Sequence, residues 1–295
     1  MNYNLIIGGV HKGASTSLFS YLMGHPDICA STTKEIHHFT PLRYGGEISD
    51  LDSYKSFFSH CSLDAKYLLE ASPSYLYGTD KIGSRLSSDL NMPKLIFILR
   101  NPTSRFISYY KHCEGKFLIP KNTSFIDFFD KNRFNLDQKD SDNPFFRGLR
   151  EGVYVDFLPY WINEFCNDVS IVFFDDLVSN PKSVLKSLSS WLNIDAGYYD
   201  DYTFEIENKT VRRRFKYLTF ITRYFNNKFE YYLRSNKSLK KIFKKIFIFL
   251  NSDSELPINE STIKEVDEFY KEKNRSLSLF LEKKGYKNLP LWLKN

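Results

Sequence analysis

Short apolar runs alternate with longer amphipathic segments along most of the chain. The apolar runs predict buried strands at residues 4–8, 66–70, 94–99 and 170–174. Apolar residues at helical spacing predict helices at 15–24, 53–59, 78–90, 102–113, 124–131, 151–166, 181–192 and 260–284. Strands that alternate with helices indicate a parallel sheet with helices on both faces, so the pattern predicts an α/β protein.

The first predicted strand leads into a loop of small residues. Residues 5–17 read LIIGGVHKGASTS and are followed by apolar residues at helical spacing. This order predicts a strand, a tight loop and a helix N-terminus, whose backbone N–H groups and dipole favour a phosphate or sulfate. Lys12 adds a positive charge, but it precedes Gly13, so the Walker pattern GxxxxGK[ST] is not met. An ordinary strand-to-helix turn is the alternative.

A second candidate anion site follows the third predicted strand. Residues 94–112 read KLIFILRNPTSRFISYYKH, which places Arg100 at the carboxyl end of the apolar run. Open α/β sheets bind their ligands at this end of the strands. The guanidinium of Arg100 and the hydroxyl of Ser108 suit a phosphate group. The alternative is that arginines in this segment pair with acids on the surface.

The two segments together resemble the PAPS-dependent sulfotransferases, PAPS being 3′-phosphoadenosine 5′-phosphosulfate. In that family the lysine loop binds the 5′-phosphosulfate, and a later RxPxxRxxSxY segment binds the 3′-phosphate. The resemblance implies that the donor contacts Lys12, Gly13, Ala14, Ser15, Thr16, Ser17, Arg100 and Ser108. It also implies a P-loop-like, three-layer α/β fold, a single domain over residues 1–295, and a catalytic role for Lys12 at the bridging oxygen.

The segment KEIHHF at residues 34–39 carries the candidate base. Glycan sulfotransferases of the heparan sulfate type have an acid followed by x-His-x-Phe at this point. By this resemblance Glu35 is the general base, and His37 orients Glu35 or the acceptor. His37 and His38 are the alternative candidates for the base, and His38 is also a candidate for contact with the acceptor. The alternative is a Glu–Lys pair that caps a helix beside a core histidine.

The chain departs from the heparan-type pattern at two positions. Ala71 stands where those enzymes have a lysine, and Thr40 stands where some of them have an acid. These departures predict an acceptor other than heparan sulfate. Glu70, at the end of the second predicted strand, is a candidate for contact with the acceptor, and a structural role is its alternative.

The positive charge of the chain comes from one segment. The formal net charge is +6, but residues 209–245 contain 13 Lys and Arg and one acid, so the remainder is negative. We expect residues 209–255 to form a basic, aromatic helical elaboration. It suits an acidic acceptor or an anionic membrane surface, or it is simply a solvated face. No nucleic-acid motif is present. The resemblance places Arg212 or Arg213 over the 3′-phosphate.

Targeting signals and cysteines indicate the cellular compartment of the protein. No stretch is apolar enough to span a membrane, and the first predicted strand leaves no room for a signal peptide. These features predict a bacterial-type cytoplasmic enzyme, with the basic segment available to the inner membrane face. Cysteines at 29, 61, 113 and 166 have no metal-ligand spacing and are expected to be reduced, mostly buried thiols.

The sequence therefore predicts a sulfotransferase that moves a sulfuryl group from PAPS to a hydroxyl or amine of a carbohydrate or glycolipid. PAP, 3′-phosphoadenosine 5′-phosphate, would be released, and no metal is expected. A PAPS enzyme for a lipid or secondary metabolite is the first alternative. A nucleotide kinase and a PAP-binding module without turnover are the others. Activity that survives removal of Mg²⁺ would exclude the kinase.

Overall fold

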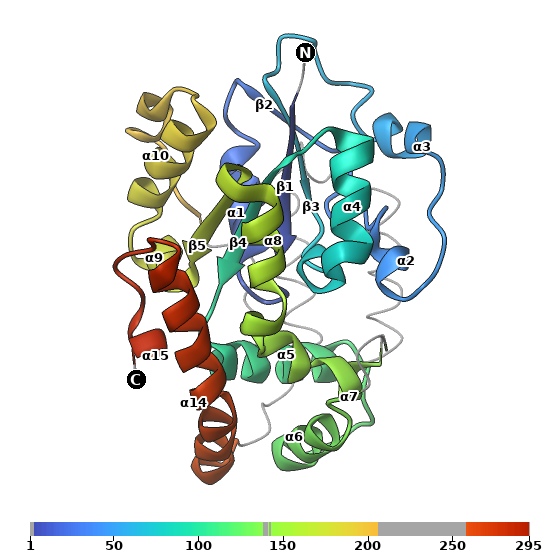
Figure 1. Cartoon of the computed structure of the whole chain (residues 1–295), viewed down its shortest axis with the longest axis vertical. Helices are drawn as coiled ribbons and strands as arrows, with labels where there is room; N and C mark the ends of the chain where they lie inside the picture. Colours follow the sequence, from blue (N-terminus) through green and yellow to red (C-terminus); the bar gives the residue numbers. More distant parts are fainter. Residues whose placement is uncertain (1–2, 138–140, 142, 206–257, 295) are drawn as a thin grey trace, which may run out of the picture. The chain divides into compact units, whose positions relative to one another are not determined.

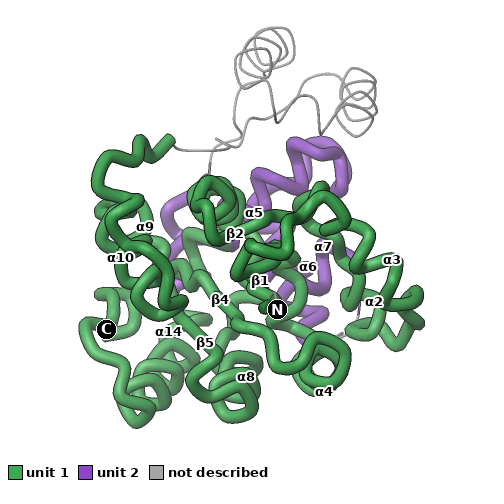
Figure 2. The backbone as a smooth tube through the Cα atoms, turned by 90° about the horizontal axis from the view of Figure 1, so that it is seen from above, with its two compact units in different colours: residues 1–105, 151–208, 268–295 green, residues 106–150, 209–267 purple. Residues whose placement is uncertain are grey.

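The structure is a computed structural model that describes residues 3–137, 141, 143–205 and 258–294. The chain separates into two compact units, which Figure 2 distinguishes by colour. The larger unit takes its described residues from 1–105, 151–208 and 268–295, and the smaller from 106–150 and 209–267. The whole basic segment, residues 209–255 with Arg212 and Arg213, lies outside the described residues. The single domain expected for residues 1–295 stays a prediction.

The larger unit is built on a five-stranded sheet with the order β2-β3-β1-β4-β5. The strands are β1 (Tyr3–Gly9), β2 (Ile28–Ala30), β3 (Tyr67–Ala71), β4 (Lys94–Leu99) and β5 (Val169–Phe173). Each neighbouring pair runs parallel, so all carboxyl ends meet at one edge. The four predicted strands are confirmed. The short edge strand β2 was not predicted, because its apolar run is too brief to stand out.

Helices cover both faces of this sheet (Figure 1). On one face, β-strand residues such as Ile6 and Phe97 pack with α4 (Thr79–Leu90), α8 (Leu158–Phe165) and α14 (Glu260–Lys283). On the other face, residues such as Leu5 and Ile96 pack with α1 (Ser15–Leu22), α9 (Phe174–Ser179) and α10 (Pro181–Leu192). Successive strand residues point to opposite faces, so the continuous apolar runs supply both cores. The predicted three-layer α/β fold is confirmed.

One predicted helix, at residues 151–166, is wrong in its first half. That half forms short 3₁₀ turns, Arg150–Gly152 and Tyr154–Asp156, and the α-helix proper is only α8. Pro159 lies in the first turn of α8, where its missing N–H costs nothing, but it cannot sit inside a longer helix. Among the described helices, none is both long and apolar enough to cross a membrane.

The smaller unit contains α-helices, one of which confirms the helix predicted at residues 124–131. The remaining α-helices of the described chain are α2 (Thr40–Arg43), α3 (Leu51–Ser56), α5 (Pro102–Gly115), α6 (Phe125–Phe134), α7 (Pro144–Arg147) and α15 (Leu291–Lys294). In this unit the ring of Phe106 on α5 stacks at 5.2 Å on Phe128 of α6. Asn132 ties α6 to the segment after α7, because its Oδ1 accepts a hydrogen bond from Leu149 N at 2.9 Å.

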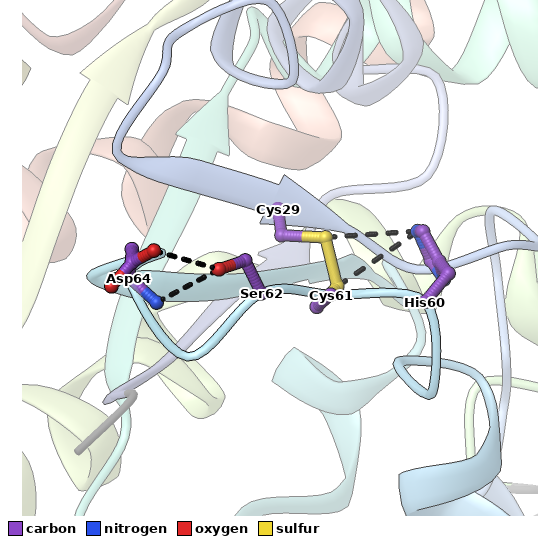
Figure 3. Close-up of a disulfide and its surroundings, with 5 residues drawn as sticks. All are labelled: Cys29, His60, Cys61, Ser62 and Asp64. Carbon is purple, nitrogen blue, oxygen red and sulfur yellow. Dashed lines mark hydrogen bonds between the residues drawn. A yellow bond between two sulfur atoms is a disulfide. The ribbon is translucent and has the colours of Figure 1, made fainter.

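The cysteine prediction is wrong for one pair. Cys29 on β2 and Cys61 in the turn after α3 form a disulfide, with their Cα atoms 5.8 Å apart (Figure 3). Cys113 is a buried free thiol and Cys166 an exposed one. His60 Nε2 lies 3.6 Å from Cys29 Sγ, so this trio has metal-ligand chemistry. The sulfurs are bonded to each other, however, and thiolate ligands require the reduced state. Scattered spacing did not reveal the pairing, because the fold brings these segments together.

Candidate active site at the carboxyl edge of the sheet

The loop between β1 and α1 holds the lysine of the predicted anion site. Lys12 and Ala14 both adopt left-handed backbone conformations, with φ of 66° and 69°. Between them, a Cβ on Gly13 would lie 2.9 Å from Val10 Cγ2 and 3.0 Å from the backbone oxygen of Ile98. Only glycine fits this position. The helix α1 begins directly after the loop, so the N–H groups of its first turn lie beside Lys12.

Arg100 follows the last residue of β4 and is hydrogen-bonded to the loop that carries Lys12. Its Nη1 donates a hydrogen bond to the backbone oxygen of Lys12 at 3.0 Å, and its guanidinium carbon lies 4.3 Å from the ring centroid of Phe174. Arg100 therefore positions the loop that carries Lys12. Its Nε–H group is buried and has no acceptor among the described residues. Ser108 lies on α5, within the smaller unit.

The candidate base lies in the loop between β2 and α2. Glu35 and His37 both have positive φ, 64° and 57°, a strained conformation that is concentrated at functional sites. Glu35 Oε1 lies 2.6 Å from Lys34 Nζ, and Oε2 lies 3.5 Å from His37 Nε2. Burial alone would raise the pKa of Glu35, but the hydrogen bond with His37 and the charge of Lys34 hold it well below its usual range. Glu35 is therefore ionised at neutral pH.

Glu70 supports this loop from inside the protein. Its side chain is fully buried at the end of β3, and its Oε2 accepts a hydrogen bond from Ser72 Oγ at 2.9 Å. Ser72 Oγ in turn accepts a hydrogen bond from His37 N at 3.1 Å. Burial raises the pKa of Glu70 to about 7, although hydrogen bonds from Ser72 and Tyr75 oppose the rise. Direct contact of Glu70 with an acceptor stays a prediction.

His38, the other candidate in this segment, is packed among aromatic rings. Its ring centroid lies 4.7 Å from that of Phe39 and 5.3 Å from that of Tyr54. Burial lowers the pKa of His38, so its ring is neutral near pH 7. Its Nδ1 lies 3.4 Å from Ser49 Oγ. The structure thus gives His38 a core position with one polar contact toward the neighbouring loop.

A buried carboxylate that sequence reasoning missed joins several of these segments. Glu151 has no exposed surface, and its Oε1 accepts a hydrogen bond from Arg43 Nη1 at 2.9 Å. Its Oε2 lies 3.1 Å from His11 Nδ1 and 3.9 Å from Arg105 Nη1. His11 directly precedes Lys12, and its charge also lowers the pKa of Glu35. Glu151 and Arg43 are 108 positions apart, so no local sequence signal links them.

Comparison with known protein families identifies the family of this chain. Residues 84–278 match the sulfotransferase domain. The chain is a member of the sulfotransferase family. The matched region includes Arg100 and Ser108 but begins after Lys12 and Glu35, so those two assignments depend on the geometry described above and on the sequence motifs.

Other sulfotransferases are similar over the greater part of this chain. Human heparan sulfate glucosamine 3-O-sulfotransferase 5 is 28% identical over 195 residues, which cover 64% of this chain and 53% of that protein. Membrane-associated sulfotransferase kil1 of Dictyostelium discoideum is 25% identical over 276 residues, 68% of this chain and 58% of that protein. The chain thus spans little more than half the length of these two curated relatives.

A solved sulfotransferase has the same fold. The crystal structure of a sulfotransferase from Alicyclobacillus acidocaldarius superposes with a TM-score of 0.60 and covers 79% of this chain and 95% of its own. At 21% sequence identity this likeness concerns the fold alone. It agrees with the P-loop-like α/β architecture of the larger unit.

Replacement of Glu151 tests the buried charge cluster of this sulfotransferase. Glu151→Gln would remove the negative charge that the buried guanidinium groups of Arg43 and Arg105 share at Glu151. Removal of one partner from a buried ion pair typically costs about 3–5 kcal/mol, and we expect a loss of that order in urea unfolding. Glu164→Gln, at an exposed position on α8, is the matched control and should change stability by less than about 0.5 kcal/mol. Equal behaviour of the two variants would contradict the role of Glu151.

The raised pKa of Glu70 predicts a pH-dependent stability. The carboxyl titrates near 4.5 in the unfolded chain and near 7 in the fold, so stability falls as pH rises between these values. Glu70→Gln removes this loss. We expect the difference in unfolding free energy, variant minus wild type, to grow by about 3 kcal/mol between pH 4.5 and pH 8. A difference that does not change with pH in urea titrations would show that Glu70 is not held protonated.

Proposed function

We propose that this sulfotransferase moves a sulfuryl group from PAPS to a hydroxyl or amine of a carbohydrate or glycolipid and releases PAP. The observation that carries the proposal is the hydrogen bond between Arg100 and the backbone of Lys12, which joins two anion-binding candidates at the ends of neighbouring strands. The phosphosulfate would lie on residues 12–17. The 3′-phosphate would lie on Arg100, with Ser108 and with Arg212 or Arg213.

The residues at this edge fit such a donor. Gly13 packs its backbone against Val10 and the backbone oxygen of Ile98, and this close packing fixes the conformation of the loop that carries Lys12. The buried Nε of Arg100 has no hydrogen-bond partner in the described part of the chain, and a phosphate oxygen would supply one. The positive charge of Lys12 and the N–H groups at the start of α1 favour a doubly anionic group.

The proposed reaction needs a general base for the acceptor and positively charged or N–H groups that stabilise the leaving phosphate. The acceptor oxygen or nitrogen forms a bond to sulfur while the bond from sulfur to the bridging oxygen breaks. Lys12 and the N–H groups of α1 stabilise the negative charge that develops on the leaving phosphate. Glu35 receives the proton of the acceptor, and His37 holds the Glu35 carboxylate in place.

The low pKa of Glu35 adds a condition to this scheme. A carboxylate paired with Lys34 and His37 is a weak base. We expect an acceptor hydroxyl that reaches Glu35 to displace Lys34 from the carboxylate. Loss of that charge partner raises the pKa of Glu35 and makes proton transfer more favourable. The base would thus become active only when an acceptor is bound.

The setting of the reaction is also a proposal. Cytoplasmic location and contact of residues 209–245 with an anionic membrane surface are predictions from the sequence. Residues 209–245 lie outside the described residues. The Cys29–Cys61 disulfide is a bond more typical of oxidising compartments. Thiol counting on protein isolated without reductant would show whether the bond exists in the cell.

A thermal-shift titration with PAP tests the donor site. A ligand that binds only the folded state raises Tm in proportion to RT ln(1 + [L]/Kd). We expect a clear rise with PAP and a much smaller one with adenosine 5′-phosphosulfate, which lacks the 3′-phosphate. Arg100→Ala should remove most of the PAP shift, while Arg85→Ala, at an exposed arginine on α4, should keep it. A shift with ATP–Mg²⁺ in place of PAP would favour the kinase alternative.

Lys12 is expected to act mainly on the rate of the reaction. Removal of one preorganised electrostatic group typically lowers kcat by about 10²-fold or more, and Lys12→Ala should do so in assays of PAP release. Lys55→Ala is the matched control, because Lys55 is an exposed lysine on α3. Near-normal turnover by Lys12→Ala would remove Lys12 from the chemical step.

A further inference from the structure

A hollow of about 430 Å³ opens beside the candidate base. His37 lies in its wall, and the same imidazole lies 3.5 Å from Glu35 Oε2. A molecule bound in the hollow would therefore contact His37, the neighbour of the proposed proton acceptor. All described residues that line the hollow fall between positions 36 and 57.

The wall of the hollow belongs to one covalent ring. The Cys29–Cys61 disulfide closes the chain around residues 30–60 and so encloses every lining position (Figure 3). A hydrogen bond from Thr32 N to the backbone oxygen of Phe57, at 2.9 Å, is a second tie across the ring. A segment tied at both ends loses little conformational entropy when a ligand binds. The hollow is therefore preorganised to discriminate between acceptors.

The charge of this wall excludes one class of acceptor. Glu47 lines the hollow, whereas no Lys or Arg does so among the described residues. Lys34, a nearby cation that pairs with Glu35 at 2.6 Å before an acceptor binds, does not line the hollow. Burial lowers the pKa of His38, so this lining residue adds no positive charge near pH 7. A polyanionic chain at this wall would meet a carboxylate and gain no ion pair, which opposes its binding.

The rest of the lining combines hydroxyl groups with apolar surface. The hydroxyls of Ser49, Ser53 and Ser56 already make hydrogen bonds within this segment, and their oxygens can still accept from a ligand. Ile36, Ile48 and Phe57 supply apolar contacts. Sugars present the same combination, because hydroxyl groups surround ring faces of C–H groups. We infer that the acceptor is an uncharged sugar, as carried by a neutral glycolipid, and not a polyanionic glycan. This inference rests on the proposed sulfotransferase reaction and names its substrate class.

Competing acceptors test the inference directly. Octyl β-glucoside is an uncharged glycolipid analogue, and a heparosan oligosaccharide is a polyanionic one. With PAPS as donor, we expect kcat/KM for octyl β-glucoside to exceed that for heparosan by about tenfold or more. Ser56→Lys places a cation in the hollow and should lower this ratio by about tenfold. Ser59→Lys is the matched control, since Ser59 is also an exposed serine in this region but does not line the hollow, and it should leave the ratio unchanged.

The outcomes separate the acceptor class from the reaction itself. A preference for heparosan in the wild type, or an equal response of Ser56→Lys and Ser59→Lys, would overturn the inference. Failure to sulfate octyl β-glucoside while PAP still raises Tm would also overturn it, and the donor site would stand. Absence of any PAP shift would instead count against the proposed function.

Discussion

Two buried arginines in the core of the larger unit share one carboxylate as an ion-pair partner. Arg43 and Arg105 are almost fully enclosed, and isolated charges in such surroundings are strongly unfavourable. Glu151, which is equally enclosed, compensates them and also holds His11 at 3.1 Å. The loop before Lys12, the helix α2 and the start of α5 therefore meet around one negative charge. The arrangement of the active-site edge depends on this charge balance.

The parallel sheet explains why these loops share an edge. Each strand ends at the same side, so the loops after β1, β2 and β4 bring Lys12, Glu35 and Arg100 to one region. The proposed donor site occupies the middle of the sheet, on β1 and β4. The proposed acceptor site lies toward the edge strand β2, inside the ring closed by the Cys29–Cys61 disulfide. In the proposed reaction, donor and acceptor would be bound by separate loops, with Glu35 on the acceptor side.

Glu35 and Glu70 are both linked to His37 but lie in opposite environments. Glu35 is partly exposed and paired with cations, so its pKa is low. Glu70 is buried and reaches the backbone of His37 only through Ser72, so its pKa is high. Such divergence between neighbouring acids is how proteins assign different roles to the same chemical group. Here one carboxylate faces the proposed chemistry, and the other stabilises the strained loop that carries it.

The sequence by itself determined the α/β class, four of the five strands and the family, because buried strands and anion loops have local signatures. It also singled out Lys12, Glu35 and Arg100, each within a short motif. Only the tertiary structure decided the Glu151 cluster and the Cys29–Cys61 bond. Charge pairs and disulfides between distant segments depend on which elements become neighbours, and local spacing does not encode that.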